Sequence, residues 1–330
     1  MPMPAESHLA SLEVFRREVI APAIIADRAP LDAAAFQSAK PLRFDAARRA
    51  RFRPVRVGWN WGPAWSTCWF RLRGSVPSSW RGLPANLHFN SGTEALLWAG
   101  PGDPAHGFDA NRHIAPLAAR PDEPLDLLVE AACNHPLGAA PLPWEHADLA
   151  QRWSGSAPGH FTAAELVIVD PALQRLDRAW AFAIALAREL LPPPPPITTH
   201  SDLFPANLPW QAPRCEGLLA ALRAAHRLID PNDPRRGAGA ALRVLESALR
   251  SPPAGSTTLC HAIGHAHIDT AWLWPLRETH RKCLRTFSNV LSLMDRHPGF
   301  RFIASQAAQY AMVEADAPAL FRRITRRVAS

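Results

Sequence analysis

The sequence predicts a multidomain protein: an N-terminal β-sandwich of jelly-roll type, a helical linker, and the first strands and helices of a parallel α/β barrel. Residues 41–170 alternate apolar and polar side chains between closely spaced turn signals, as short antiparallel strands do. Residues 171–255 show helical spacing, and residues 256–330 follow the strand, helix, strand, helix order that begins a parallel sheet. With 330 residues, 48% of them hydrophobic, the chain can hold about two domains.

Residues 1–40 are expected to form a helical lead-in. Apolar residues recur there at helical spacing: Leu9, Leu12, Phe15 and Val19. This spacing predicts a helix over 6–25, and Pro22 is expected to end it because proline has no backbone N–H to donate.

The predicted sandwich spans residues 41–170. Cys68, Phe70 and Leu72 alternate with polar or oppositely facing neighbours, and 125–131 repeats the pattern, which is the period of a strand. Four tryptophans gather within eleven residues: Trp59, Trp61, Trp65 and Trp69. We interpret them as core of the sandwich, with a sugar-binding surface as the alternative.

The linker, 171–255, begins with Asp170-Pro171, a capping residue followed by a good first helical residue. The helix that follows is expected to stop before the five prolines at 192–196, which favour a stiff extended spacer. Two more helices are predicted over 215–229 and 238–250.

The final segment, 256–330, is predicted to begin the catalytic α/β domain. An apolar strand is expected at 258–264 and a second at 300–305, with a helix over 277–296 between them. Further helices are expected to begin near Gln306 and near Pro318.

Composition excludes several classes of function. The net charge is +7, from 36 basic and 29 acidic residues, but no basic run is interleaved with aromatic side chains as in nucleic-acid binders. No signal peptide or membrane span is recognised. The five cysteines are scattered without a CxxC spacing, which favours a reducing compartment. We therefore expect a cytoplasmic, soluble protein with no nucleic-acid or membrane partner.

The candidate site lies in Gly264–Trp274, GHAHIDTAWLW. In parallel α/β folds the chemistry lies at the carboxyl ends of strands, where this segment is predicted to fall. His265, His267 and Asp269 would face one side of a continuing strand, and imidazole with carboxylate is a donor set for Zn²⁺. From spacing alone, a hydrogen-bonded His–Asp pair in a loop is an equal alternative.

Residues 257–328 closely resemble the opening of the catalytic domain of class II α-mannosidases, glycoside hydrolase family 38, in the cytosolic and bacterial branch. The resemblance rests on His-x-His-x-Asp-x-x-Trp and the Pro-Leu-Arg-Glu-Thr that follows. Weaker matches run through the earlier region: WGPAWST at 61–67, GTE at 92–94, NRH at 111–113 and VEAA at 129–132.

The resemblance implies a retaining α-mannosidase that acts on α-mannosyl oligosaccharides with one divalent metal ion, most often Zn²⁺. It implies that His267 and Asp269 are metal ligands, that Trp272 is a substrate-binding wall, and that His265 is structural. Three further residues receive structural interpretations: Trp274 in the core, and Arg277 and Glu278 in capping or local pairing. Gln306, at the end of the second predicted strand, has no assigned role.

The resemblance also implies that no catalytic residue lies in this chain, because the family's nucleophile, acid/base and further metal ligand come later. We therefore expect the chain to be an N-terminal fragment that is inactive alone. For the full-length protein, a monomer and a homo-oligomer are both compatible with the sequence. Two alternatives are weighed. One is a non-catalytic carbohydrate-binding sandwich with a catalytic stub. The other is a metallo-β-lactamase-like hydrolase, which Thr270 opposes because that family carries a histidine there.

Overall fold

A computed structural model describes residues 5–134, 147–191, 211–250 and 260–329. These residues form two compact units: one comprises 1–27 with 168–260, the other 28–167 with 261–330. The five-proline run and residues 258–259 of the predicted strand lie outside the described residues. Among the described helices, none combines the length and apolar character needed to cross a bilayer.

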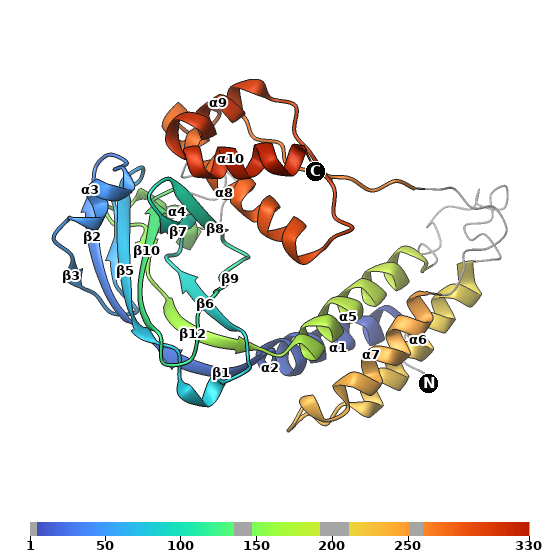
Figure 1. The fold of residues 1–330 in the computed structure, drawn as a ribbon. Coiled ribbons are helices and arrows are strands. Elements are labelled where there is room, and N and C mark those ends of the chain that lie inside the picture. Colours follow the sequence, from blue (N-terminus) through green and yellow to red (C-terminus); the bar gives the residue numbers. More distant parts are fainter. Residues whose placement is uncertain (1–4, 135–146, 192–210, 251–259, 330) are drawn as a thin grey trace. The chain divides into compact units, whose positions relative to one another are not determined.

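The first unit is built from helices around one apolar core (Figure 1). Its elements are α1 (Ala5–Phe15), a π-helical turn (Arg16–Ile20), α2 (Ala21–Ala23), α5 (Pro171–Glu189), α6 (Gln211–Leu228) and α7 (Arg235–Leu249). Leu9 and Leu12 of α1 pack against Trp180 of α5, whose indole N–H donates to the carbonyl of Leu12 at 3.1 Å. The N-terminal helix and the linker helices therefore form one body, although they are far apart in sequence.

Asp170 starts α5 as predicted. Its side chain accepts hydrogen bonds from the backbone N–H groups of Ala172 and Leu173 at 2.9 and 3.0 Å, which satisfies donors that the helix leaves free. Pro22 does not end the first helix as expected. It lies in the first turn of α2, where proline's missing N–H is tolerated, and the π-helical turn precedes it.

The second unit contains a β-sandwich of two sheets (Figure 1). The larger sheet has the order β3-β2-β5-β10-β7-β8, with bounds Arg53–Pro54, Asp32–Ser38, Thr67–Ser75, Pro124–Ala132, Ala95–Gly100 and Asp103–Phe108. The smaller has the order β1-β12-β6-β9, with bounds Ile25–Pro30, Ala163–Val169, Ala85–Asn90 and Ile114–Pro116. A short pair, β4 (Asn60–Trp61) and β11 (Gly159–His160), forms a separate two-stranded sheet. Helices α3 (Phe44–Arg48) and α4 (Ala147–Ser154) complete the segment.

The predicted start of the sandwich at residue 41 is wrong. Strands β1 and β2 lie within the supposed helical lead-in, and β2 pairs along its length with β5. The small side chains of 32–35, mostly alanine, give little strand signal, so only the pairing with β5 reveals this strand.

Aromatic side chains fill the space between the sheets. Phe70, Phe89 and Phe161 contact one another with ring centroids 5.1–6.1 Å apart. Trp61 is buried beside Phe70, whereas Trp69 points from the opposite face of β5 into a second cluster. Trp61 and Trp69 are core residues as expected, whereas Trp59 and Trp65 are only partly buried.

The second unit also contains the C-terminal segment. Strands β13 (Gly264–His265) and β14 (Phe302–Ile303) pair in parallel, and three helices follow or connect them: α8 (Leu276–Arg296), α9 (Ala307–Asp316) and α10 (Pro318–Val328). The strands are shorter than predicted, because backbone pairing between them is limited to Gly264 with Phe302 and His265 with Ile303. The strand, helix, strand, helix order is as expected, but two strands do not show a barrel.

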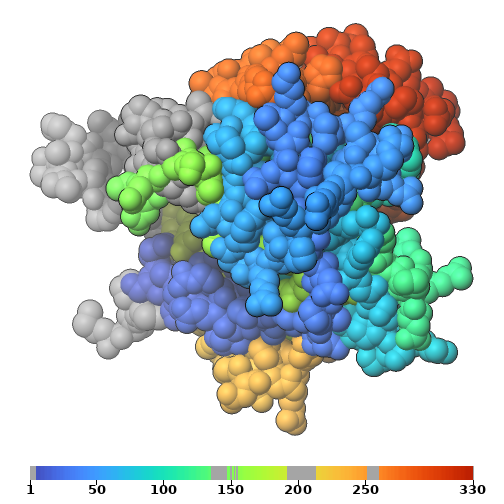
Figure 2. Space-filling model, turned by 90° about the vertical axis from the view of Figure 1, so that its left-hand side faces the viewer, coloured from blue at the N-terminus to red at the C-terminus, as the bar shows by residue number. Residues whose placement is uncertain are grey.

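Helix α8 packs directly on the sandwich (Figures 1 and 2). Gly107 of β8 lies so close to the helix that an added Cβ would stand 2.7 Å from the Cβ of Arg285. The side-chain amide of Asn289 accepts from the N–H of Gly107 at 2.9 Å and donates to its carbonyl at 3.0 Å. Because β8 is the last strand of its sheet, this helix covers an otherwise unpaired edge.

Candidate functional site

The motif begins where β13 ends. His265 lies in the strand, and its Nδ1–H donates to the carbonyl of Ile303 on β14 at 3.0 Å. The chain then leaves the strand, so the following residues do not continue the alternation assumed from sequence. His265 therefore helps to join the two strands and does not meet the next two polar residues.

His267 and Asp269 meet each other at the strand end. The imidazole Nε2 lies 2.9 Å from a carboxylate oxygen of Asp269, and the two side chains are 77% and 39% exposed. Imidazole nitrogen and carboxylate oxygen are both ordinary ligands of Zn²⁺. The pair therefore fits such an ion as two of its donors. No group of three metal-binding side chains occurs among the described residues.

The loop that carries the motif is held by two buried side chains that the sequence analysis missed. Thr279 of α8 bonds to Asp269, Ala271 and Trp274 through its hydroxyl. Gln309 of α9 donates to the carbonyl of Ile268 at 2.7 Å. Thr279 is the fourth residue of α8 and Gln309 the third of α9. These positions were a weak signal, because a polar residue in the first turn usually serves its own helix end.

Trp272 and Trp274 flank the donor pair. Trp272 is 56% exposed and meets Trp274 edge-on, with centroids 5.4 Å apart. Trp274 is half-buried rather than a core residue, and the ammonium of Lys282 lies 4.6 Å from its ring centroid. His267 and both tryptophans line a hollow of about 370 Å³, together with Glu94 and Asp109 of the sandwich.

A cluster of six charged residues joins α8 to the sandwich beside this hollow. Three are carboxylates and three are cations: Glu94, Glu130, Glu278, Arg281, Lys282 and Arg285. Glu94 accepts from Lys282 at 2.7 Å and from Arg285 at 2.5 Å, and Arg285 also bonds to Glu278. The expected local pairing of Glu278 is therefore present, whereas Arg277 is exposed.

Burial and pairing act in opposite directions on these carboxyl groups. Burial alone would raise the pKa of Glu94, but Arg285 and Lys282 outweigh it, and the pKa lies below its ordinary value. At Glu130 burial dominates over Arg281 and Arg285, so its pKa is raised. Each charge of the cluster is thus paired within the protein, and Glu94, Lys282 and Arg285 also line the hollow.

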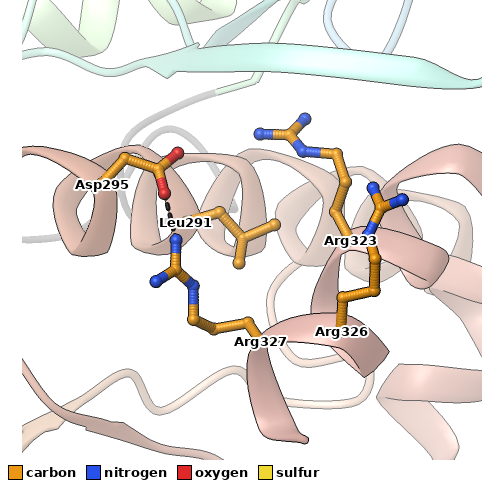
Figure 3. A pocket seen from close by; sticks show the side chains of 5 residues that line it. All are labelled: Leu291, Asp295, Arg323, Arg326 and Arg327. Atoms are coloured by element: carbon orange, nitrogen blue, oxygen red, sulfur yellow. Dashed lines mark hydrogen bonds and ion pairs between the residues drawn. The ribbon is translucent and has the colours of Figure 1, made fainter. Parts of the chain in front are cut away.

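Two other hollows contain no residue of the motif. One lies on α8 and α10 and is lined by Leu291, Asp295 and three arginines, of which Arg327 pairs with Asp295 (Figure 3). The other, of about 820 Å³, lies on the sandwich near Phe52, where Arg71 is already bonded to Asp126 at 2.6 Å. Gln306 is exposed at the start of α9 and borders none of these three hollows.

Comparisons with known proteins find two matching domains along the chain, in the order of the sandwich and the C-terminal segment. Residues 29–154 match the α-mannosidase jelly roll domain, and residues 257–330 match the N-terminal domain of glycosyl hydrolases family 38. The two matches place a jelly roll domain before the N-terminal domain of a glycoside hydrolase along the chain. The chain belongs to glycoside hydrolase family 38, the α-mannosidases, and the metallo-β-lactamase-like alternative is wrong.

Curated relatives align along most of the chain. Alpha-mannosidase 2C1 of Homo sapiens is 31% identical over 304 residues, which are 88% of this chain and 26% of that protein. Alpha-mannosidase of Saccharomyces cerevisiae is 29% identical, over 83% and 24%. The chain therefore spans about a quarter of the length of these relatives. A β-glucuronidase of Faecalibacterium prausnitzii aligns at 14% identity and a TM-score of 0.28, over 44% of this chain and 32% of that one, too low to bear on the fold.

Proposed function

We propose that this chain supplies the jelly roll and the first part of the active site of a retaining α-mannosidase that uses a divalent metal ion, most often Zn²⁺. The observation that carries the proposal is the exposed donor pair of His267 and Asp269, 2.9 Å apart at the end of a parallel strand. A bound ion would supply an electrophile that orients and polarises sugar oxygens.

Trp272 is proposed to contact the sugar. Its ring is more than half exposed at the rim of the hollow that contains His267, and aromatic faces suit the apolar faces of sugar rings. The substrate is proposed to be an α-mannosyl oligosaccharide, from the printed names of the relatives. A cytoplasmic site of action is part of the same proposal, supported by five cysteines that form no disulfide.

The isolated 330-residue chain is proposed to be inactive. A catalytic zinc site takes about three protein ligands, and a retaining glycosidase needs two carboxyl groups about 5–5.5 Å apart. We assign neither the nucleophile nor the acid/base to this chain. Release of nitrophenol from a nitrophenyl α-mannoside by the purified chain would contradict this part of the proposal.

The sugar contact can be tested without turnover. Saturation-transfer NMR of methyl α-mannoside with the chain and Zn²⁺ should show transfer in the wild type and a loss in Trp272→Ala. Trp65→Ala is the matched control, because Trp65 is only partly buried and does not line the hollow. Equal loss in both variants, or no transfer to α-mannoside in the wild type, would contradict the assignment of Trp272.

A further inference from the structure

We infer that Thr279 is a positioning residue for the donor pair: its one hydroxyl fixes the loop from Asp269 to Trp274 in the shape that presents His267 and Asp269 together. This inference rests on the proposed metal-binding function. Thr279 itself touches neither donor side chain, so it acts through the backbone of the loop.

The hydroxyl of Thr279 is fully used. It accepts from the backbone N–H of Ala271 at 2.9 Å and from the indole N–H of Trp274 at 3.0 Å, and it donates to the carbonyl of Asp269 at 3.1 Å. A hydroxyl has one proton to donate and two lone pairs to accept with. All three are engaged, and the side chain is 0% exposed, so no water can replace it without rearrangement.

The loop needs such a restraint. Ala271 has a φ of 57°, in the left-handed region that a residue with a Cβ seldom adopts unless its neighbours hold it there. The N–H of Ala271 is one of the groups bonded to Thr279. The same threonine bonds to the carbonyl of Asp269, so it joins the strained residue to the backbone of a proposed ligand.

A second buried residue restrains the other side of the pair. Gln309, 3% exposed, donates from its amide to the carbonyl of Ile268 at 2.7 Å. Ile268 lies between His267 and Asp269 in the chain. The backbone that separates the two donors is therefore fixed from α8 by Thr279 and from α9 by Gln309.

Three variants of the chain separate positioning from packing. Thr279→Val keeps the shape and removes the hydroxyl, and Thr279→Ser keeps the hydroxyl. Ser288→Ala is the matched control, because Ser288 is also fully buried on α8 and its hydroxyl bonds to the carbonyls of Leu284 and Pro104 and not to the motif. Each variant is first shown to be folded by its far- and near-UV circular dichroism.

The first readout does not depend on metal. In hydrogen-exchange NMR, the indole N–H of Trp274 and the backbone N–H of Ala271 should lose protection in Thr279→Val and keep it in Thr279→Ser and Ser288→Ala. Unchanged protection of both groups in folded Thr279→Val would overturn the inference.

The second readout is the affinity for Zn²⁺ by isothermal titration calorimetry. Loss of a partner that orients a ligand lowers metal affinity by about 10–100-fold, and we expect the lower end of this range for Thr279→Val. Thr279→Ser and Ser288→Ala should stay within about twofold of the wild type, well below that range. Wild-type affinity in Thr279→Val would overturn the inference. If the wild type binds no Zn²⁺, the proposed function fails, and the exchange readout still decides whether Thr279 fixes the loop.

Discussion

The charged cluster between α8 and the sandwich and the donor pair at the end of β13 contribute residues to the same hollow but differ in burial and in pairing. The cluster places three carboxylates and three cations in or near the interior, and each is paired across the contact with the sandwich or within α8. Among the residues that the structure describes, the side chains of His267 and Asp269 instead pair only with each other, and they are 77% and 39% exposed. Paired and buried charge serves the fold, whereas exposed donors with spare lone pairs can serve a ligand.

The largest effect is expected from Arg285, the most enclosed cation of the cluster. Arg285→Met should lower the free energy of unfolding by about 3–5 kcal/mol, because it removes the cation that pairs with both Glu94 and Glu278 and leaves the three carboxyl groups of the cluster with two cations. Urea unfolding of the chain measures this. Arg277→Met, on the exposed side of the same helix, should change the free energy of unfolding by less than about 0.5 kcal/mol. Equal stability of the two variants would contradict the distinction between buried and exposed charge.

Gly107→Ala tests the close contact of β8 with α8. The added Cβ would stand 2.7 Å from the Cβ of Arg285 and 3.0 Å from its backbone atoms, so the helix must move. We expect a loss of about 1–3 kcal/mol, as for other overpacked interiors, measured by thermal unfolding. Gly100→Ala, with no atom within 4 Å of its added Cβ, is the control. Tolerance of Gly107→Ala would mean that α8 is not fixed on the sandwich.

His106, which precedes Gly107 on β8, is expected to make the stability of this contact depend on pH. Burial, with a smaller effect of Arg296 on α8, lowers its pKa from 6.5 to about 4. The unfolded chain therefore binds the proton first as pH falls, and stability is lost between about pH 6.5 and 4. His106→Gln should reduce the slope of stability against pH in that window by at most about 1.4 kcal/mol per pH unit. An unchanged slope in urea unfolding at several pH values would contradict this.

The smallest effect on stability is expected at the motif. Asp269→Asn changes a side chain that is 39% exposed and paired with a 77% exposed histidine. Exposed pairs contribute about 0–1 kcal/mol, so unfolding by urea should be nearly unchanged. A loss as large as that of Arg285→Met would show that the pair is structural, like the cluster.

The sequence predicted what depends on local pattern. The cap at Asp170, the helix over α8 and the parallel order of β13 and β14 follow from spacing and end signals. What it missed depends on contacts between distant segments. The alanines of β2 become a strand only by pairing with β5, and α1 joins the linker helices only through burial against α5.

The same division holds at the candidate site. The residue types and spacing of His267 and Asp269 indicated a donor pair, and the structure brings their side chains together. The supports could not be predicted, because Thr279 and Gln309 reach the loop from two later helices. Likewise Glu94 and Lys282 are 188 positions apart and meet only when α8 lies on the sandwich.

The most direct test of the account is a calorimetric titration of the chain with Zn²⁺, in the wild type and in His267→Ala and Asp269→Asn. The account predicts one ion per chain, bound weakly because two donors are fewer than a full zinc site requires. It also predicts that either substitution abolishes this binding while the urea unfolding curve stays in place. Equal binding of Zn²⁺ by the wild type and both variants would show that the exposed pair is not the metal site.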